Sequence, residues 1–251
     1  MTPITPQKNS QPRLGVSAPW IDGLVNARDL GGLMRADGGL TPTGVFVRAE
    51  ALDEVTARGW EQLAAHGVRA IIDLRRPKER SGAPPAGFTV ARVDLDGDDA
   101  AFWGPREADG TWGTPLYYLD YLASQGARMR EALDALAAAP DGGVLFHCAA
   151  GWDRTGLMAA MLLRAVGVTT EAAAVDYAAS FDNADAYEAL HGRSSHAAMR
   201  LGLLRELGRT PRSAFGEVYE GIDPLAWFEA AGVSAATRAA VCSWRGALAA
   251  P

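Results

Sequence analysis

Residues 147–156, HCAAGWDRTG, constrain this chain more than any other segment. They contain a cysteine and an arginine with five residues between them. A short apolar run that predicts a strand precedes them, and an apolar stretch that predicts a helix follows. A loop that enters a helix in this way turns successive backbone N–H groups inward and adds the positive end of the helix dipole. The segment therefore predicts an anion cradle of a size that suits phosphate.

The polar residues of this segment each have a physical use in such a cradle. Cys148 is the expected nucleophile, because positive surroundings favour its thiolate form, and Arg154 supplies a planar fork that can hold two phosphate oxygens. Thr155 can donate its hydroxyl to the sulfur, and Gly151 permits the backbone angles of a tight loop. His147 is expected to hydrogen-bond the loop backbone and to tune the thiol. The expected substrate-binding residues are His147, Ala149, Ala150, Gly151 and Trp152.

A cysteine taken alone is more often a small buried hydrophobic residue than a nucleophile. That interpretation is disfavoured for Cys148, because the combined pattern arises by chance on the order of once in tens of thousands of chains. It is the expected interpretation for Cys242, which lies in an amphipathic pattern near the end of the chain. Since the chain has only two cysteines, in unrelated contexts, neither a disulfide framework nor a multi-cysteine metal site is expected.

Strands that alternate with helices favour an α/β fold, in which helices flank a mostly parallel central sheet and ligands gather at the carboxyl ends of its strands. Cys148 would lie at that edge. Residues 96–115, rich in Gly and Asp, are expected to form a long loop over it, either as a lid or as a mobile surface excursion. Apolar runs predict strands at residues 44–48, 68–74, 88–95 and 144–147.

No internal repeat or long linker divides the chain. We therefore expect a flexible N-terminal arm at residues 1–19, which are rich in Pro, Thr, Ser and Gln, followed by one catalytic domain at residues 20–251. Helical periodicity predicts helices at residues 53–66, with Asp53 as N-cap, at 127–139 and 155–166, and in a helical C-terminal part at 171–180, 184–191, 195–207 and 234–248.

Composition and charge exclude several classes of function. The chain has 24 basic and 30 acidic residues, and a net charge of −6 argues against a broad nucleic-acid surface. No apolar stretch approaches the ~20 residues of a membrane-spanning helix, and residues 1–19 lack the apolar core of a secretory leader. We expect a cytoplasmic protein without a nucleic-acid partner or an integral membrane segment. Export by a non-standard route and the oligomeric state are left open.

The cradle residues resemble the cysteine-dependent protein tyrosine phosphatase superfamily, whose phosphate loop reads His-Cys, five residues, then Arg-Ser/Thr. Residues 26–32, NARDLGG, and 72–80, IDLRRPKER, are similar to motifs of the bacterial tyrosine and lipid phosphatase family, which includes secreted mycobacterial and Listeria enzymes. Residues 176–183 are a looser match. The resemblance implies a phosphatase-like α/β sheet, metal-free hydrolysis and a cysteinyl-phosphate intermediate.

The chain departs from the pattern of this family at two positions. Trp152 stands where members commonly carry Lys, which weakens the expectation of a phosphoinositide substrate. Its ring could face an aryl or heteroaryl group of the substrate or pack against the sheet edge. Ala27 stands where the family often has Phe, and we expect this to change packing more than chemistry. Arg28 and Asp29 are expected to form a structural pair.

The group that protonates the leaving oxygen is less well defined, because the chain lacks the Trp-Pro-Asp loop of the larger tyrosine phosphatases. Asp153 is the family's candidate for this role, and helix capping is its alternative. Asp73, at the end of a predicted strand, is the second candidate. Its alternative role is a salt bridge to Arg75, Arg76 or Arg80.

Together these features predict a phosphate monoester hydrolase that acts on phosphotyrosine in proteins or on a related aryl phosphate, by thiolate attack and hydrolysis of the cysteinyl-phosphate. A phosphoinositide or a soluble metabolite phosphate is the alternative substrate. A catalytically silent phosphate-binding module, or a sulfur-transfer protein with a persulfide on Cys148, is less favoured. The histidines form no recognisable zinc set, so neither a metal nor a cofactor is expected.

Overall fold

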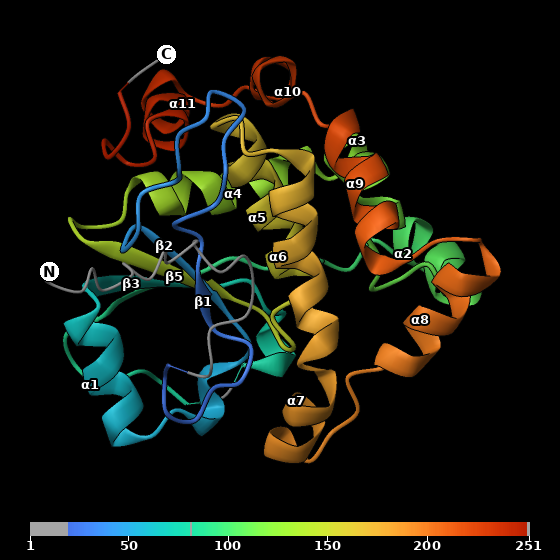
Figure 1. Ribbon diagram of the computed structural model, residues 1–251, viewed down its shortest axis with the longest axis horizontal. Helices are drawn as coiled ribbons and strands as arrows, with labels where there is room; N and C mark the ends of the chain where they lie inside the picture. Colours follow the sequence, from blue (N-terminus) through green and yellow to red (C-terminus); the bar gives the residue numbers. More distant parts are fainter. Residues whose placement is uncertain (1–19, 81, 250–251) are drawn as a thin grey trace, which may run out of the picture.

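The computed structural model describes residues 20–80 and 82–249, so the arm expected at residues 1–19 lies outside the described residues. The strands are β1 (Arg28–Asp29), β2 (Phe46–Ala49), β3 (Val68–Asp73), β4 (Thr89–Arg92) and β5 (Gly143–His147). They form one sheet in the order β1-β2-β5-β3-β4 (Figure 1). β1 pairs antiparallel with β2, and the other neighbours pair in parallel. The predicted mostly parallel sheet is confirmed, and each predicted strand is present.

Helices surround this sheet and make up most of the chain after residue 169, as predicted. No helix in the described part of the chain has the length and apolar character needed to traverse a lipid bilayer. The helices are α1 (Ala57–Ala65), α2 (Ala100–Ala108), α3 (Tyr118–Ser124), α4 (Gly126–Ala137), α5 (Arg154–Ala165), α6 (Thr170–Asp182), α7 (Ala184–His191), α8 (Ala197–Glu206), α9 (Pro211–Gly221), α10 (Pro224–Ala230) and α11 (Ala235–Cys242).

The two faces of the sheet bury two separate hydrophobic clusters, because successive strand residues point to opposite faces. On β5, Val144 and Phe146 join the larger cluster and Leu145 the smaller one. On β3, Ile72 and Ile71 divide in the same way. α1 covers the smaller cluster, and α4 and α5 cover the larger one on the opposite side of the sheet (Figure 1). The central strands β2, β5 and β3 are therefore buried on both faces apart from one exposed residue of β3, whereas the edge strand β4 stays partly exposed.

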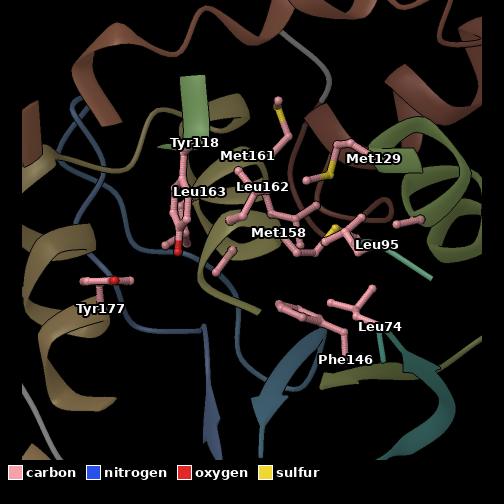
Figure 2. Packing of buried hydrophobic residues seen from close by; sticks show 14 of the residues in the cluster. Leu74, Leu95, Tyr118, Met129, Phe146, Met158, Met161, Leu162, Leu163 and Tyr177 are labelled. Carbon is pink, nitrogen blue, oxygen red and sulfur yellow. The ribbon is translucent and has the colours of Figure 1, made fainter. Parts of the chain in front are cut away.

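Helix α5 is the centre of the larger cluster. Its sequence is apolar on all sides, which is typical of a helix buried on all sides. Figure 2 shows Met158 and Leu162 of this helix above Phe146 of β5, with Met129 of α4 nearby. Since α5 follows the cradle directly, this packing fixes the position of the segment that carries Cys148.

Two predicted helices have different ends in the structure. α1 is capped by Thr56, whose side chain accepts the Gly59 N–H at 3.1 Å, and not by Asp53, which lies in a separate 3₁₀ turn. The last helix ends at Cys242 and not at residue 248, because Trp244 and Arg245 adopt positive φ angles. This turn buries the Trp244 ring against the larger cluster. Cys242 is half-buried beside it.

The prediction of a long loop at residues 96–115 is wrong, because the centre of this segment forms α2. Asp99 caps this helix by accepting the N–H groups of Ala101 and Phe102. Phe102 and Trp103 are buried among tyrosine rings, and the Trp103 indole donates to the Asp96 carbonyl at 2.8 Å. Capping and aromatic burial together outweigh the Gly and Asp content that suggested a loop.

Truncation of the core beneath the cradle should destabilise the protein. Leu162→Ala removes a fully buried side chain of α5, and we expect the free energy of unfolding to fall by about 3 kcal/mol. Leu225→Ala on α10, where the leucine is 65% exposed, should change it by less than about 0.5 kcal/mol. Urea unfolding measures both values. Equal unfolding midpoints for the two variants would contradict the assigned core.

Candidate active site

In the loop of residues 148–153, between β5 and α5, several backbone carbonyls accept hydrogen bonds from other segments of the chain. Four of these carbonyl oxygens accept hydrogen bonds from neighbouring segments. The donors are Ala51 N to Ala149 (2.9 Å), Asn26 Nδ2 to Ala150 (2.8 Å), Arg48 Nη2 to Gly151 (2.8 Å) and the Tyr118 hydroxyl to Asp153 (2.8 Å). The N–H of a trans peptide points opposite to its C=O, and the described residues contain no cis peptide. The N–H groups that follow these carbonyls therefore face inward, which is an arrangement that can bind an anion.

Gly151 makes this loop tight enough to close. Its φ angle is 73°, a left-handed conformation that glycine adopts without strain. A Cβ atom there would lie 2.6 Å from the backbone of Ala49. Both findings agree with the special backbone geometry expected of this residue from the sequence.

Cys148 lines a cavity of about 180 Å³, named here the Cys148 pocket, and its residue surface is 3% exposed. The Nδ1 atom of His147 lies 3.1 Å from the Cys148 carbonyl oxygen, to which it donates. Burial lowers the pKa of His147 to about 4, so its imidazole is neutral at neutral pH. The hydrogen bond from His147 to the loop backbone is the one expected from the sequence.

The Arg154 guanidinium points into the Cys148 pocket and is held by two carboxylates. Its Nη1 and Nη2 atoms donate to the two oxygens of Glu79 at 2.6 and 2.9 Å, and Nη1 also lies 3.1 Å from Asp96 Oδ2. Burial raises the pKa of Glu79, but the bonds to Arg154 outweigh this and keep it below its ordinary value. Burial, together with the nearby charge of Glu79, raises the pKa of Asp96. The carboxylates fix the orientation of the fork and offset its charge.

Asp153 lies in an environment that favours the protonated form of its carboxyl group more than water does. Burial raises its pKa to about 6, against the opposing charges of Arg200 and Arg154. Its Oδ1 atom has no hydrogen-bond partner among the described residues, and it lines the Cys148 pocket. Part of the Asp153 residue surface is exposed, whereas its Oδ1 atom is buried. Asp153 can therefore give or take a proton close to Cys148.

Asp73 lies in a different setting. The Nε and Nη2 atoms of Arg75 donate to its two carboxylate oxygens at 2.9 and 3.0 Å. The salt bridge anticipated as the alternative role of Asp73 is therefore present. Burial raises its pKa, but Arg75 and His147 together bring it below the ordinary value. Asp73 lines a second pocket, next to His147, and not the Cys148 pocket. The structure does not bring Asp73 to the nucleophile.

Trp152 is packed inside the protein. Its residue surface is 1% exposed, and its ring stacks on Phe181 of α6 with centroids 4.6 Å apart and an interplanar angle of 9°. The guanidinium of Arg200 lies over the same ring at 4.7 Å. Of the two roles anticipated for Trp152, packing applies, but the partner is α6 and not the sheet edge. Its ring is not available as a wall for the substrate.

The expected pair between Arg28 and Asp29 is wrong. Asp29 lies 2.6 Å from His66 Nε2, whereas Arg28 Nε donates to Asp176 Oδ1 at 2.6 Å. Arg48 binds the other oxygen of Asp176 at 2.5 Å. Burial raises the pKa of Asp176, but the charges of the two arginines outweigh this and lower it. Since Arg48 also holds the cradle backbone, this ion-pair network anchors the cradle to α6.

Thr155 does not show its expected contact. Its Oγ1 is buried and has no hydrogen-bond partner among the described residues, so no bond to the Cys148 sulfur is formed here.

Sequence reasoning missed several residues that line the Cys148 pocket, among them Glu79, Asp96 and Arg200. Glu79 belongs to the motif at residues 72–80, and its place in that motif was the available signal. Asp96 follows a strand, and a carboxylate at a strand's carboxyl end was a usable hint. Arg200 lies far along the chain in α8, and no local pattern distinguishes it from a surface arginine.

The chain is similar to several known proteins. The model of a family described as the tyrosine phosphatase family matches residues 19–241. A tyrosine-protein phosphatase of Nostoc commune is 32% identical over 144 residues, which cover 55% of this chain and 49% of that protein. A putative tyrosine-protein phosphatase of Cupriavidus necator is 34% identical over 164 residues, which cover 62% of this chain and 60% of that protein. The chain thus spans about half the length of these curated relatives.

Among solved structures, two crystal structures of TpbA from P. aeruginosa are similar to the chain, one of them a variant in complex with pTyr. Both are 21% identical to it. The pTyr complex has a TM-score of 0.33 and covers 63% of this chain and 85% of its own, and the other has a TM-score of 0.34 and covers 75% and 86%. The family match, by contrast, extends over most of the sequence and includes the whole cradle. The chain belongs to the tyrosine phosphatase family.

Proposed function

We propose that this protein hydrolyses phosphate monoesters, with phosphotyrosine in proteins as its substrate, through a cysteinyl-phosphate on Cys148. The observation that carries the proposal is that Cys148 lines a pocket that combines inward-facing N–H groups with the fork of Arg154. The names of its relatives, tyrosine-protein phosphatases, support the same reaction. Residues 20–251 would serve as the catalytic domain.

In the first step the Cys148 thiolate attacks phosphorus. The S–P bond forms as the bond to the leaving oxygen breaks, and Asp153 transfers its proton to that oxygen. The loop N–H groups and Arg154 stabilise the charge that builds on the three other phosphate oxygens. Because these groups are already oriented by Glu79 and by the outer hydrogen bonds, little reorganisation is needed at the moment of reaction.

In the second step water hydrolyses the cysteinyl-phosphate. Asp153, now a carboxylate, takes a proton from the water as its oxygen bonds to phosphorus. The S–P bond breaks, inorganic phosphate leaves and the Cys148 thiolate and the protonated Asp153 are restored. One difficult displacement is thereby divided into two easier ones.

The depth of the site supports an aryl phosphate. Cys148 is almost fully buried and is reached through the pocket, whose walls include Trp112 and Tyr187. A phenyl ring extends its phosphate farther from a peptide backbone than the single methylene of serine does. An aromatic phosphate ester therefore reaches the sulfur, and its ring lies between apolar side chains.

Replacement of the nucleophile should abolish turnover. We expect Cys148→Ser to lower the rate of phosphate release from an aryl phosphate in excess chelator by roughly 1,000-fold or more. Cys242→Ser, at the half-buried cysteine of α11, is the matched control and should keep the wild-type rate. Substantial activity in Cys148→Ser would refute cysteine catalysis.

A substrate panel should separate the substrate classes. At equal concentration, kcat/KM should be highest for phosphotyrosine peptides and lower for phosphoserine peptides, phosphoinositide vesicles and sugar phosphates. Phosphoserine peptides control for peptide binding, because the peptide is the same and only the ester differs, in its reach and in its leaving group. A preference for phosphoinositides or for a small metabolite would overturn the substrate assignment and leave the mechanism standing.

The pH profile should report Asp153. A proton donor must be protonated, and its pKa of about 6 predicts that kcat/KM falls as the pH rises above about 6. Asp153→Asn should lose this limb and about 100-fold in kcat/KM on phenyl phosphate, a poor leaving group. Its loss on p-nitrophenyl phosphate should be smaller, because that leaving group needs less protonation. If the limb survives in Asp153→Asn and disappears in Asp96→Asn, the proton donor is Asp96.

A further inference from the structure

Helix α8 brings a second guanidinium into the Cys148 pocket. Arg200 is 4% exposed, and its guanidinium carbon lies 4.8 Å from the ring centroid of Trp112 and 4.7 Å from that of Trp152. An arginine between two indole rings is held by cation–π attraction, which is strengthened where water is excluded. The burial of this cation is therefore a specific feature of the site and not an accident of surface packing.

The orientation of this group is fixed from further sides. Its Nη1 donates to the Ser195 carbonyl at 3.0 Å. It lies flat against the backbone of Gly113, where a Cβ atom would come within 2.3 Å of Nε and Nη2. The buried Nε has no hydrogen-bond partner among the described residues. A buried donor without an acceptor is costly, and a bound anion would remove that cost.

The two arginines of the pocket, Arg154 and Arg200, differ in their pairing with carboxylates. Arg154 is paired with both Glu79 and Asp96, so a phosphate dianion approaching it also meets two carboxylates. Within residues 20–80 and 82–249, Arg200 forms no ion pair with a carboxylate within 4.0 Å. Burial is the largest effect on the pKa of Arg200 and lowers it. The nearby Asp153 and Cys148 act in the opposite direction and raise this pKa.

We propose that Arg200 is a second phosphate-binding cation of this site, which donates to a non-bridging oxygen of the substrate phosphate. This role of Arg200 rests on the proposed phosphatase function and adds a substrate-binding residue to it. The ring of Trp152, in the loop that follows Cys148, contacts this cation supplied by α8. The phosphate would thus be held by Arg154 on one side and by Arg200 on another, so that binding depends on the C-terminal helical part of the chain.

The test measures the affinity of the full-length protein for inorganic phosphate, by calorimetry and as a competitive inhibition constant. Loss of a charged hydrogen bond predicts that Arg200→Gln weakens phosphate binding about 10- to 100-fold and raises KM in proportion, with a smaller effect on kcat. Arg200→Lys keeps the charge but loses the planar fork, so it should restore part of the affinity. If Arg200 only supported the fold, Arg200→Gln would lower the unfolding midpoint without changing the phosphate affinity of the folded protein.

A paired glycine substitution displaces the guanidinium without removing its charge. Gly113→Ala places a Cβ atom against Arg200, whereas Gly110→Ala, with nearly the same φ angle of 77°, meets nothing closer than Leu203 at 3.7 Å. Both substitutions carry similar backbone strain, so Gly110→Ala measures the effect of that strain alone, and Gly113→Ala adds the contact with Arg200. Only Gly113→Ala should weaken phosphate binding.

The outcomes separate the two proposals. Normal phosphate affinity in folded Arg200→Gln, or equal affinities in the two glycine variants, would overturn the role of Arg200 while leaving the phosphatase function intact. A wild-type protein that neither binds phosphate nor releases it from an aryl ester would overturn the proposed function, and the role of Arg200 with it. If Arg200→Gln fails to fold, Arg200→Lys and the glycine pair decide the question.

Discussion

The capture of the loop carbonyls from outside is the constraint on which the rest of the site depends. A loop can present its N–H groups to an anion only when its buried carbonyls are satisfied elsewhere. Asn26, Arg48 and Tyr118 provide these bonds from three separate parts of the chain. Arg48 in turn shares Asp176 with Arg28. Removal of one member of such a buried network is costly, because it leaves an unpaired charge. Fold stability and cradle geometry are thereby coupled.

The carboxyl groups of Asp73, Asp153 and Glu79 lie in different electrostatic environments. Asp73 is gripped by Arg75 and stays ionised, whereas burial raises the pKa of Asp153 to about 6. Pairs of acids whose environments separate their pKa values are how enzymes assign proton donors. Glu79 has a third role, since it orients Arg154. Burial and the positions of the arginines thus give the same type of side chain different pKa values at different places.

The sequence predicted the features that local patterns encode. Apolar runs located the strands and α5, and the glycine of the loop indicated its left-handed turn at residue 151. Features that depend on distant partners were missed. Arg28 pairs with Asp176, 148 residues away, and not with its neighbour Asp29. Arg200 joins the pocket only when α8 folds back, and α2 forms because Trp103 finds buried aromatic partners. Hydrophobic periodicity carries no information on such long-range contacts.

The central claim is that phosphate is bonded to Cys148 during turnover. The direct measurement is rapid acid quench of the enzyme with a radiolabelled aryl phosphate, followed by peptide mapping of the phosphoenzyme. The account predicts a transient label on the peptide that contains Cys148, formed in a burst with the phenol and lost as inorganic phosphate appears. Turnover without any labelled enzyme, or a label on a different residue, would contradict it.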